Sequence, residues 1–235
     1  MTLDTGRMDV ALEAALTLAA QKPWNSISLA EIAREANKTL ADFYGEIDKD
    51  GLVDELDQRL DKACCCEPVE ADASLRERVF EVAMLRFEEM EKHRDAILSI
   101  RKSWMFDPLR RLKAAGRRLR TARWMLTCAE EDGPAIHANA VGLSAILFRA
   151  EEAWAKETSP DFTRTMAQLD RDLRSVEDFA EHFLNDRNLV ANRCFSAKFA
   201  FDVGRGCEVI CVDVRVDDPF TGQALFTHIG DHLVC

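Results

Sequence analysis

Apolar side chains recur every three or four positions through the first 184 of the 235 residues, a spacing typical of amphipathic helices. The row Val10, Ala14 and Leu18 is one example. Ser28 precedes Glu31 by three positions, which predicts a capping box at a helix start. Helix starts are predicted in the same way at Ser28, Thr39, Asp48 and Ser74. The later helices are predicted over residues 94–105, 107–131 with a break at Gly116, 133–156 and 159–184.

The pattern changes character after Asn185. Residues 194–203 and 207–216 alternate with period two and are separated by Gly204-Arg205-Gly206, which predicts a β-hairpin. A hairpin attached to a helical body is unusual. It could be an accessory element, a partner-binding arm or a stretch foreign to the original reading frame.

Charge restricts the classes of partner. The chain has 31 Lys and Arg against 42 Asp and Glu, a formal net charge of −11, which argues against a protein that coats nucleic acid by bulk charge. No apolar run approaches the roughly 20 residues that cross a bilayer, and no secretory signal is visible. We therefore expect a soluble, cytoplasmic protein. Its eight cysteines are then expected to be reduced thiols, with Cys64, Cys65 and Cys66 at a helix end.

The first 63 residues indicate a helix-turn-helix unit: a short capped helix, a tight turn at 36–38, a second short helix from 39 to 44 and a longer helix. Residues 28–44 and 47–53 resemble the N-terminal domain of tetracycline-repressor-type (TetR) regulators. The resemblance implies that the helix at 39–44 enters the DNA major groove. The candidate DNA-binding residues are Lys38, Thr39, Tyr44 and Lys49.

This unit departs from the TetR pattern. Asn37 occupies the position of the turn glycine, and Ile47 replaces an aromatic residue. Residues 1–63 contain seven Lys and Arg against thirteen Asp and Glu, so the cluster of cations with which a DNA reader holds phosphates is missing. The plainer interpretation is that Phe43 and Tyr44 pack the small domain and that Thr39 only caps a helix.

The helical body carries a second resemblance. Residues 75–87, 122–129 and above all 152–173 look like the lipid-binding accessory family of ubiquinone (coenzyme Q) biosynthesis, and the likeness covers roughly residues 8–184. The resemblance implies a TetR-like fold that binds isoprenoid or phospholipid chains and presents quinone intermediates to a partner hydroxylase. It places Trp124 and Met125 in a partner-binding surface patch. A buried tryptophan is the alternative.

The large apolar residues of the body are core by default, but an elongated cavity for an acyl or isoprenoid chain would be lined by the same side chains. Ser159, Pro160 and Asp161 read as a helix start, with Ser159 as the cap and Pro160 at the first position. The candidate ligand-binding residues are Phe80, Met84, Phe87, Trp104, Leu112, Ile146, Phe148, Trp154 and Phe162.

One predicted helix holds the densest run of basic residues: Arg110, Arg111, Lys113, Arg117, Arg118, Arg120 and Arg123. Its other side carries Leu109, Leu112, Leu119 and Leu126. Most charge runs are solvated faces. In a chain of net charge −11, an amphipathic basic helix also suits anionic lipid headgroups or an acidic partner.

Catalytic and metal sites are weakly indicated. Cys207, Cys211, His228 and His232 have spacings close to those of a zinc site, but the separation between the two pairs is longer than in a usual finger. No phosphate loop, nucleophile elbow or metal-hydrolase motif is present. We therefore expect no enzyme activity, no metal and no cofactor.

These patterns predict an all-α, TetR-like protein with a helix-turn-helix-like domain at 1–66, a helical ligand-binding and dimerisation domain at 67–185, and a tail at 186–235. The preferred function is a non-enzymatic lipid- or isoprenoid-quinone-binding accessory protein of ubiquinone biosynthesis, in peripheral contact with the inner face of the membrane. The alternative is a ligand-responsive transcriptional regulator of the TetR type. By the resemblance we expect a homodimer through the helices at 133–157 and 159–184.

Overall fold

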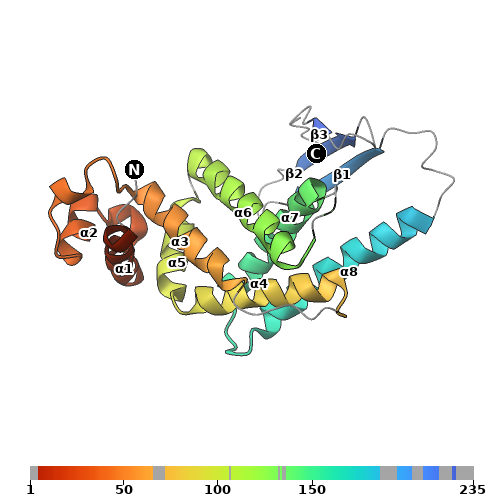
Figure 1. Cartoon of the computed structure of the whole chain (residues 1–235), viewed down its shortest axis with the longest axis horizontal. Helices are drawn as coiled ribbons and strands as arrows, with labels where there is room; N and C mark the ends of the chain where they lie inside the picture. Colours follow the sequence, from red (N-terminus) through yellow and green to blue (C-terminus); the bar gives the residue numbers. More distant parts are fainter. Residues whose placement is uncertain are drawn as a thin grey trace.

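The computed structural model describes the backbone of residues 5–65, 72–105, 107–131, 133, 136–185, 195–202, 209–216 and 224–225, with side chains described up to residue 175. The N-terminal part lies at one end of an elongated molecule (Figure 1). It consists of α1 (Thr5–Gln21), η1 (Trp24–Ser26), α2 (Leu29–Glu35), η2 (Leu40–Phe43) and α3 (Lys49–Ala63), where η denotes a 3₁₀ helix.

A second group of helices forms the body: α4 (Leu75–Glu91), α5 (Arg94–Ser103), α6 (Pro108–Cys128), α7 (Ile136–Ala155) and α8 (Thr163–Asn185). Helix α7 packs against both α6 and α8, while α5 packs against α1 and so joins the body to the N-terminal part. The described residues are thus predominantly helical, as the apolar spacing predicts.

Polar side chains start the helices where the sequence predicts. The Ser28 hydroxyl accepts from the Glu31 amide, and the Glu31 carboxylate accepts from the Ser28 amide at 2.8 Å, so the predicted capping box is confirmed. Ser74 forms the same arrangement at α4. Asn37 has a φ of 54°, the left-handed conformation expected for an asparagine that ends a helix.

The predicted short helix after the turn is present, but it is a 3₁₀ helix and ends before Tyr44. Thr39 does cap an element and forms a capping box with Asp42, but that element is η2, a four-residue 3₁₀ helix. Tyr44 already has extended dihedral angles and Gly45 follows with a φ of 76°. A positive φ is easily adopted by glycine and stops the helix there.

Two other helix boundaries also differ from prediction. Helix α6 continues through Gly116 without the expected break. Helix α8 begins at Thr163, not at Ser159, because Phe162 has a φ of 51° and the Glu157 carboxylate accepts the amides of Arg164 and Thr165 at 2.8 and 3.0 Å. A side chain from the preceding turn therefore caps α8.

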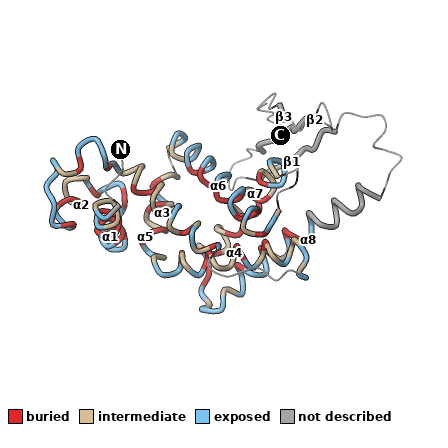
Figure 2. Tube along the Cα trace, viewed as in Figure 1, coloured by how far each residue is buried: buried red, intermediate tan, exposed pale blue. Residues whose placement is uncertain are grey.

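One apolar core runs from the N-terminal part into the body (Figure 2). Phe43, Leu52 and Phe87 are almost fully buried in it, and Trp154 is completely buried. Trp154 also donates from its indole nitrogen to Glu91 at 2.8 Å, which satisfies the polar atom of a buried ring. The continuous core means that the N-terminal part does not pack as an isolated unit.

Strands occur in the tail, where the sequence alternates. β1 (Phe195–Asp202) pairs antiparallel with β2 (Val209–Val216) in the register Phe195 with Val216, and β3 (Ala224–Leu225) pairs with β2. β1 and β2 coincide with the two segments of period two, whereas β3 lies beyond them.

Candidate functional site

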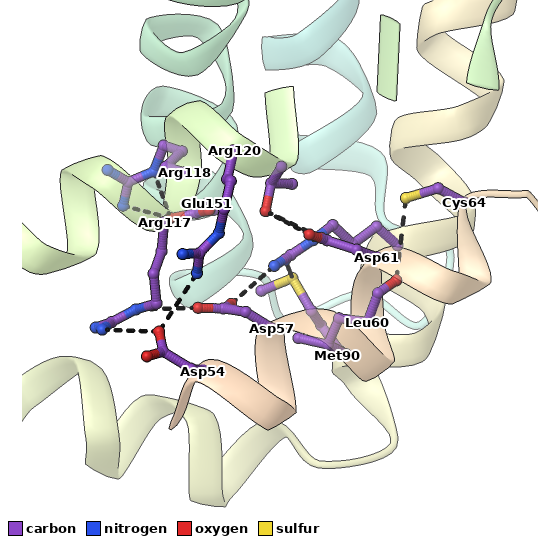
Figure 3. A network of polar contacts seen from close by, with 12 residues as sticks. Asp54, Asp57, Leu60, Asp61, Cys64, Met90, Arg117, Arg118, Arg120 and Glu151 are labelled. Atoms are coloured by element: carbon purple, nitrogen blue, oxygen red, sulfur yellow. Dashed lines mark hydrogen bonds and ion pairs between the residues drawn. The ribbon is translucent and has the colours of Figure 1, made fainter. Parts of the chain in front are cut away.

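Four acidic side chains lie on one face of α3. Asp50, Asp54, Asp57 and Asp61 follow one another at spacings of four, three and four residues, which places them on the same side of a helix. That side faces α6, whose sequence has seven Arg and Lys and no acidic residue. The acidic row of α3 and the part of the basic run that faces it, Lys113, Arg117 and Arg120, therefore form two sides of one interface (Figure 3).

The two helices pair in a constant register. Lys113 Nζ donates to Asp50 Oδ2 at 2.5 Å, and the Trp124 indole nitrogen donates to the Asp61 carbonyl at 2.8 Å. Both pairs join residues 63 apart in the sequence, and so does the disulfide described below. A constant separation means that α3 and α6 run side by side in the same direction, each advancing by the same rise per residue.

The pairs in this interface differ in burial. The side chains of Lys113 and Asp50 are about half exposed, as is the Arg120–Asp54 pair at 3.3 Å, so each pair contributes little to stability. Arg117, by contrast, is only 8% exposed. Its Nε lies 3.1 Å from Asp57 Oδ2, and its guanidinium lies 5.3 Å from the ring centre of Trp104.

Arg86 of α4 also pairs with two acids of the same row. Its Nη2 donates to Asp57 at 2.9 Å and its Nε to Asp61 at 3.0 Å, while the Thr121 hydroxyl donates to Asp61 at 2.9 Å. Arg86 is buried, so removal of one of its carboxylate partners would leave a buried charge partly uncompensated. Breaking a buried ion pair in this way typically costs about 3–5 kcal/mol.

Glu151 of α7 is a buried acid that binds basic residues of α5 and α6. One of its oxygens accepts from Arg101 at 2.6 Å and from Arg118 at 2.8 Å. Burial by itself would raise the pKa of Glu151, but the two guanidinium groups outweigh it and lower the pKa from 4.5 to about 2. Glu151 is therefore a carboxylate at neutral pH and ties α5, α6 and α7 together.

A small cavity of about 50 Å³ lies between these charged groups. One part of its wall is apolar, with Leu56, Met90 and Ile100, and the other carries charged side chains that include Arg117 and Glu151. Pockets for drug-sized ligands are typically about 300–1,000 Å³ and mostly apolar. An isoprenoid chain does not fit this cavity. A larger hollow of about 270 Å³ lies against α1 and residues 91–96 and is lined mainly by polar side chains.

Of the nine predicted ligand-binding residues, Trp104 lines the small cavity. Phe87, Ile146 and Trp154 are buried in the core, whereas Phe80, Met84 and Phe162 are partly buried against it. Phe148 lies under the guanidinium of Arg118, 5.0 Å from the ring centre. The assignment of Leu112 to an enclosed cavity is wrong because its side chain is 70% exposed.

The two predicted partner-binding residues have different environments. Trp124 is 43% exposed at the edge of the α3–α6 interface, as a surface patch requires. Met125 is fully buried, so its assignment to a surface is wrong. Neighbouring residues on a helix point about 100° apart, and here that offset turns Trp124 to the surface and Met125 into the core.

The candidate DNA-binding residues are also divided. Lys38 and Thr39 are exposed, and Tyr44 is 90% exposed, so the alternative that Tyr44 packs the small domain is wrong, whereas Phe43 does pack it. Lys49 points inward: its Nζ donates to the carbonyls of Trp24 and Ile27 at 2.6 and 2.7 Å and lies 4.3 Å from the Trp24 ring centre. Its assignment to a phosphate contact is therefore wrong in this conformation.

Helix α6 presents a second face to solvent. Leu109, Leu112 and Leu119 lie on one side at spacings of three and seven residues and are all exposed; we call these three residues the α6 apolar row. Arg123 follows Leu119 by one turn and is exposed on the same side. The basic helix thus uses one face to hold α3 and leaves an apolar, cation-bordered face open.

The expectation that all cysteines are reduced thiols is wrong for one pair. Cys65, just after the end of α3, and Cys128, the last residue of α6, form a disulfide with Cα atoms 5.7 Å apart. Cys64 is buried and caps α3, consistent with the predicted helix end. The general rule on redox compartments could not anticipate that the α3–α6 register brings these two thiols together.

Among the described residues, no group of three or more His, Cys, Asp and Glu could hold a metal ion. The predicted zinc ligands Cys207, His228 and His232 lie outside the described residues, as does the side chain of Cys211. In the same part of the chain, no helix is long and apolar enough to span a membrane.

Sequence reasoning missed Arg86, Arg101 and Glu151 as members of the site. They lie on three different helices, and nothing in their local sequence marks them. The acidic row of α3 did leave a signal, because its four residues share a helical face in the sequence. That signal identifies a charged helical face, but not that the basic run of α6 is its partner.

No protein-family model and no curated protein match the sequence. Solved structures do match its fold. A TetR transcriptional regulator from Nitrosomonas europaea superposes with a TM-score of 0.60 at 22% sequence identity, over 72% of this chain and 97% of that one. The fold is therefore TetR-like.

Two further TetR-like structures support the same fold. A TetR transcriptional regulator from Rhodococcus sp. RHA1 gives a TM-score of 0.59 at 17% identity, over 74% of this chain and 97% of that one. A TetR-family regulator from Streptomyces coelicolor gives 0.52 at 16% identity, over 78% and 85%. The sequence identities are low, so the agreement concerns the TetR-like fold and not a shared ligand or partner.

Proposed function

We propose that this protein is a non-enzymatic accessory protein that works at an anionic lipid surface and handles an isoprenoid quinone or a phospholipid of ubiquinone biosynthesis. The observation that supports it is the α6 apolar row, three exposed leucines on a helix with seven cations and no acid. Helices of this composition bind bilayer surfaces by burying apolar side chains while their cations meet the headgroups.

The proposed lipid contact is on the outer face of α6, because the cavity of about 50 Å³ is too small and too charged for an isoprenoid chain. Burying one leucine in the acyl region is worth about 1.5–3 kcal/mol, and each cation near an anionic surface about 1 kcal/mol. Arg111 and Arg123 are exposed near the row, so apolar and ionic contributions are available on one face.

The N-terminal part is better suited to a structural role than to DNA reading. A row of its acidic residues is directed toward α6, its turn element is a four-residue 3₁₀ helix, and Lys49 is held by backbone carbonyls. A DNA reader would instead place cations against phosphates and a helix in the major groove. The proposed partner hydroxylase would meet the exposed face of Trp124, and the proposed homodimer would form through α7 and α8.

Vesicle co-sedimentation of the full chain tests this function. Vesicles of phosphatidylcholine containing phosphatidylglycerol are expected to retain the protein, and vesicles of phosphatidylcholine alone to retain much less. The double variant Leu109→Gln/Leu112→Gln is expected to lose binding by roughly tenfold or more, because two buried leucines contribute several kcal/mol. The matched control is Val10→Gln/Leu40→Gln, which alters two exposed aliphatic residues in the N-terminal part.

Equal sedimentation of the wild type and the α6 double variant would contradict the proposal, and so would the absence of binding to both vesicle types. Organic extraction of the purified protein followed by mass spectrometry addresses the finer claim. It is expected to release an isoprenoid quinone or a phospholipid.

A second candidate is a ligand-responsive transcriptional regulator, favoured by the exposure of Tyr44 next to the turn and by the names of the structural neighbours. An effector would then act through the α3–α6 interface, which joins the helix-turn-helix to the body. Salt-sensitive retention of the DNA upstream of its own coding sequence, lost in Thr39→Ala/Tyr44→Ala, would favour this function over the first.

A further inference from the structure

The disulfide links the N-terminal part of the protein to the body. It joins the end of α3 to the end of α6, the same two helices that the acidic and basic rows hold together. It therefore closes a ring that contains α4, α5 and α6. No other covalent bond within the described residues links the N-terminal part to the body out of sequence order.

The two sulfur-bearing residues differ in access. Cys65 is exposed, Cys128 is partly buried and the neighbouring Cys64 is buried. A thiolate reductant in solution can therefore approach the Cys65 side of the bond, while the Cys64 side chain is held in the core near the Leu60 carbonyl.

We propose that Cys65–Cys128 is a reversible dithiol–disulfide site, and that its redox state sets how firmly α3 is held in register on α6. The reductant is a dithiol. One of its thiolates attacks Sγ of Cys65, the bond between the two sulfurs breaks, and Cys128 leaves as a thiolate that takes up a proton. The second thiol of the reductant then attacks the mixed disulfide, releases Cys65 as a thiol and leaves the reductant as a disulfide. Two electrons pass to the protein.

The remaining contacts explain why loss of this bond would matter. In the reduced state the N-terminal half of α3 is held to α6 by the half-exposed pairs Lys113–Asp50 and Arg120–Asp54, which are weak. Arg86 still holds Asp57 and Asp61, so α3 stays folded against α4. Without the disulfide, the hydrogen bonds from Thr121 and Trp124 to Asp61 still hold the last turns of α3 and α6 together, but no covalent bond within the described residues limits their separation.

The consequence concerns the whole N-terminal part, because α3 connects its turn elements to the body. Oxidation fixes α3 relative to α6, and reduction loosens that pairing while α1 stays packed against α5. This inference does not depend on which ligand or surface the protein binds, so it stands or falls separately from the proposed function.

The test uses the full chain purified without reductant and then treated with dithiothreitol. Maleimide labelling followed by peptide mass spectrometry is expected to find Cys65 and Cys128 unlabelled before treatment and labelled after it. Hydrogen–deuterium exchange is expected to accelerate by at least tenfold in residues 60–65 and 124–128 on reduction. Exchange in α7 is expected to stay unchanged, and oxidised glutathione is expected to restore the original pattern.

The variants Cys65→Ser and Cys128→Ser are each expected to show the reduced exchange pattern without dithiothreitol. Cys64→Ala is the matched control: it removes the adjacent thiol but keeps the bond, and is expected to behave as the oxidised wild type. The dithiothreitol experiment on wild-type protein remains decisive if a variant folds poorly. The proposal is overturned if the two thiols label before reduction, if the bond resists dithiothreitol until the protein unfolds, or if exchange in residues 60–65 is equal in both states.

Discussion

At the scale of single residues, burial decides which of two roles a charged side chain takes. Lys49 matches a position expected to contact DNA, yet its ammonium group caps the carbonyls of Trp24 and Ile27 and lies over an indole ring. Burial is the main cause of its lowered pKa, with a smaller contribution from Arg110. A cation in this position stabilises the turn that carries Trp24 and does not bind a phosphate.

Replacement of Lys49 tests this role. Lys49→Met is expected to lower the free energy of unfolding by about 2 kcal/mol, because two charge-assisted hydrogen bonds and a cation–π contact are lost. Lys38→Met, at an exposed position beside the turn, is expected to change it by less than about 0.5 kcal/mol. Urea unfolding followed by circular dichroism measures both, and equal effects would contradict the structural role of Lys49.

Glu151 makes stability depend on pH. Because its pKa is lowered from 4.5 to about 2 in the folded protein, it contributes stability that is fully present above about pH 4.5 and is lost as the pH falls toward 2. Glu151→Gln is expected to be about 3 kcal/mol less stable at pH 7, since Arg101 and Arg118 lose their shared carboxylate. The variant is also expected to show a flatter stability profile between pH 4.5 and 2 than the wild type. Parallel profiles would show that Glu151 is not the group responsible.

At the scale of elements, α3 and α6 behave as one parallel pair. Contacts at a constant separation of 63 residues run from Asp50 and Lys113 to Cys65 and Cys128. The exposed ion pairs at one end set the partner and the register, and the buried Arg117–Asp57 pair and the disulfide supply most of the strength.

The contributions of the two ends can be separated. Reduction of the disulfide is expected to lower the free energy of unfolding by about 4 kcal/mol, from the chain entropy of a ring of this size. Lys113→Ala is expected to lower it far less, because its ion pair is exposed to solvent. Guanidinium unfolding with and without dithiothreitol gives both values. A reduced protein as stable as the oxidised one would show that the disulfide does not contribute to the free energy of unfolding.

At the scale of the whole molecule, part of the acid excess is paired inside the fold. The acid excess of residues 1–63 does not make that part a repulsive surface, because a row of it is neutralised by α6. What stays open on α6 is the apolar row, and what stays open on α8 includes Met166, which is exposed. These are two separate faces, one proposed for lipid and one for a second copy of the chain.

The proposed homodimer gives a whole-molecule prediction. Light scattering coupled to size exclusion is expected to give twice the chain mass of 26.5 kDa. Met166→Glu is expected to shift the protein toward the monomer by placing a charge in the α7–α8 interface. Leu109→Gln/Leu112→Gln is the control on the other face and is expected to leave the mass unchanged. A monomeric wild type would contradict the dimer.

The sequence by itself determined the helical class, the position of most helix starts and the alternating segments of the tail. Those features depend on local physics: the period of apolar residues, and side chains such as Ser28, Ser74 and Asp48 that bind the first free amides of a helix. The resemblance to TetR regulators was likewise carried by a local pattern and agrees with the fold.

Only the tertiary structure decided where the charges go and which side chains meet. Four acids on α3 and seven cations on α6 read as two unrelated surfaces until the helices are placed side by side, and the same placement joins Cys65 to Cys128. The apolar residues assigned to a ligand tunnel were distributed between core and surface for the same reason, since helical spacing gives a face but not what covers it. Long-range packing sets burial, and burial sets both the strength of an ion pair and the accessibility of a site.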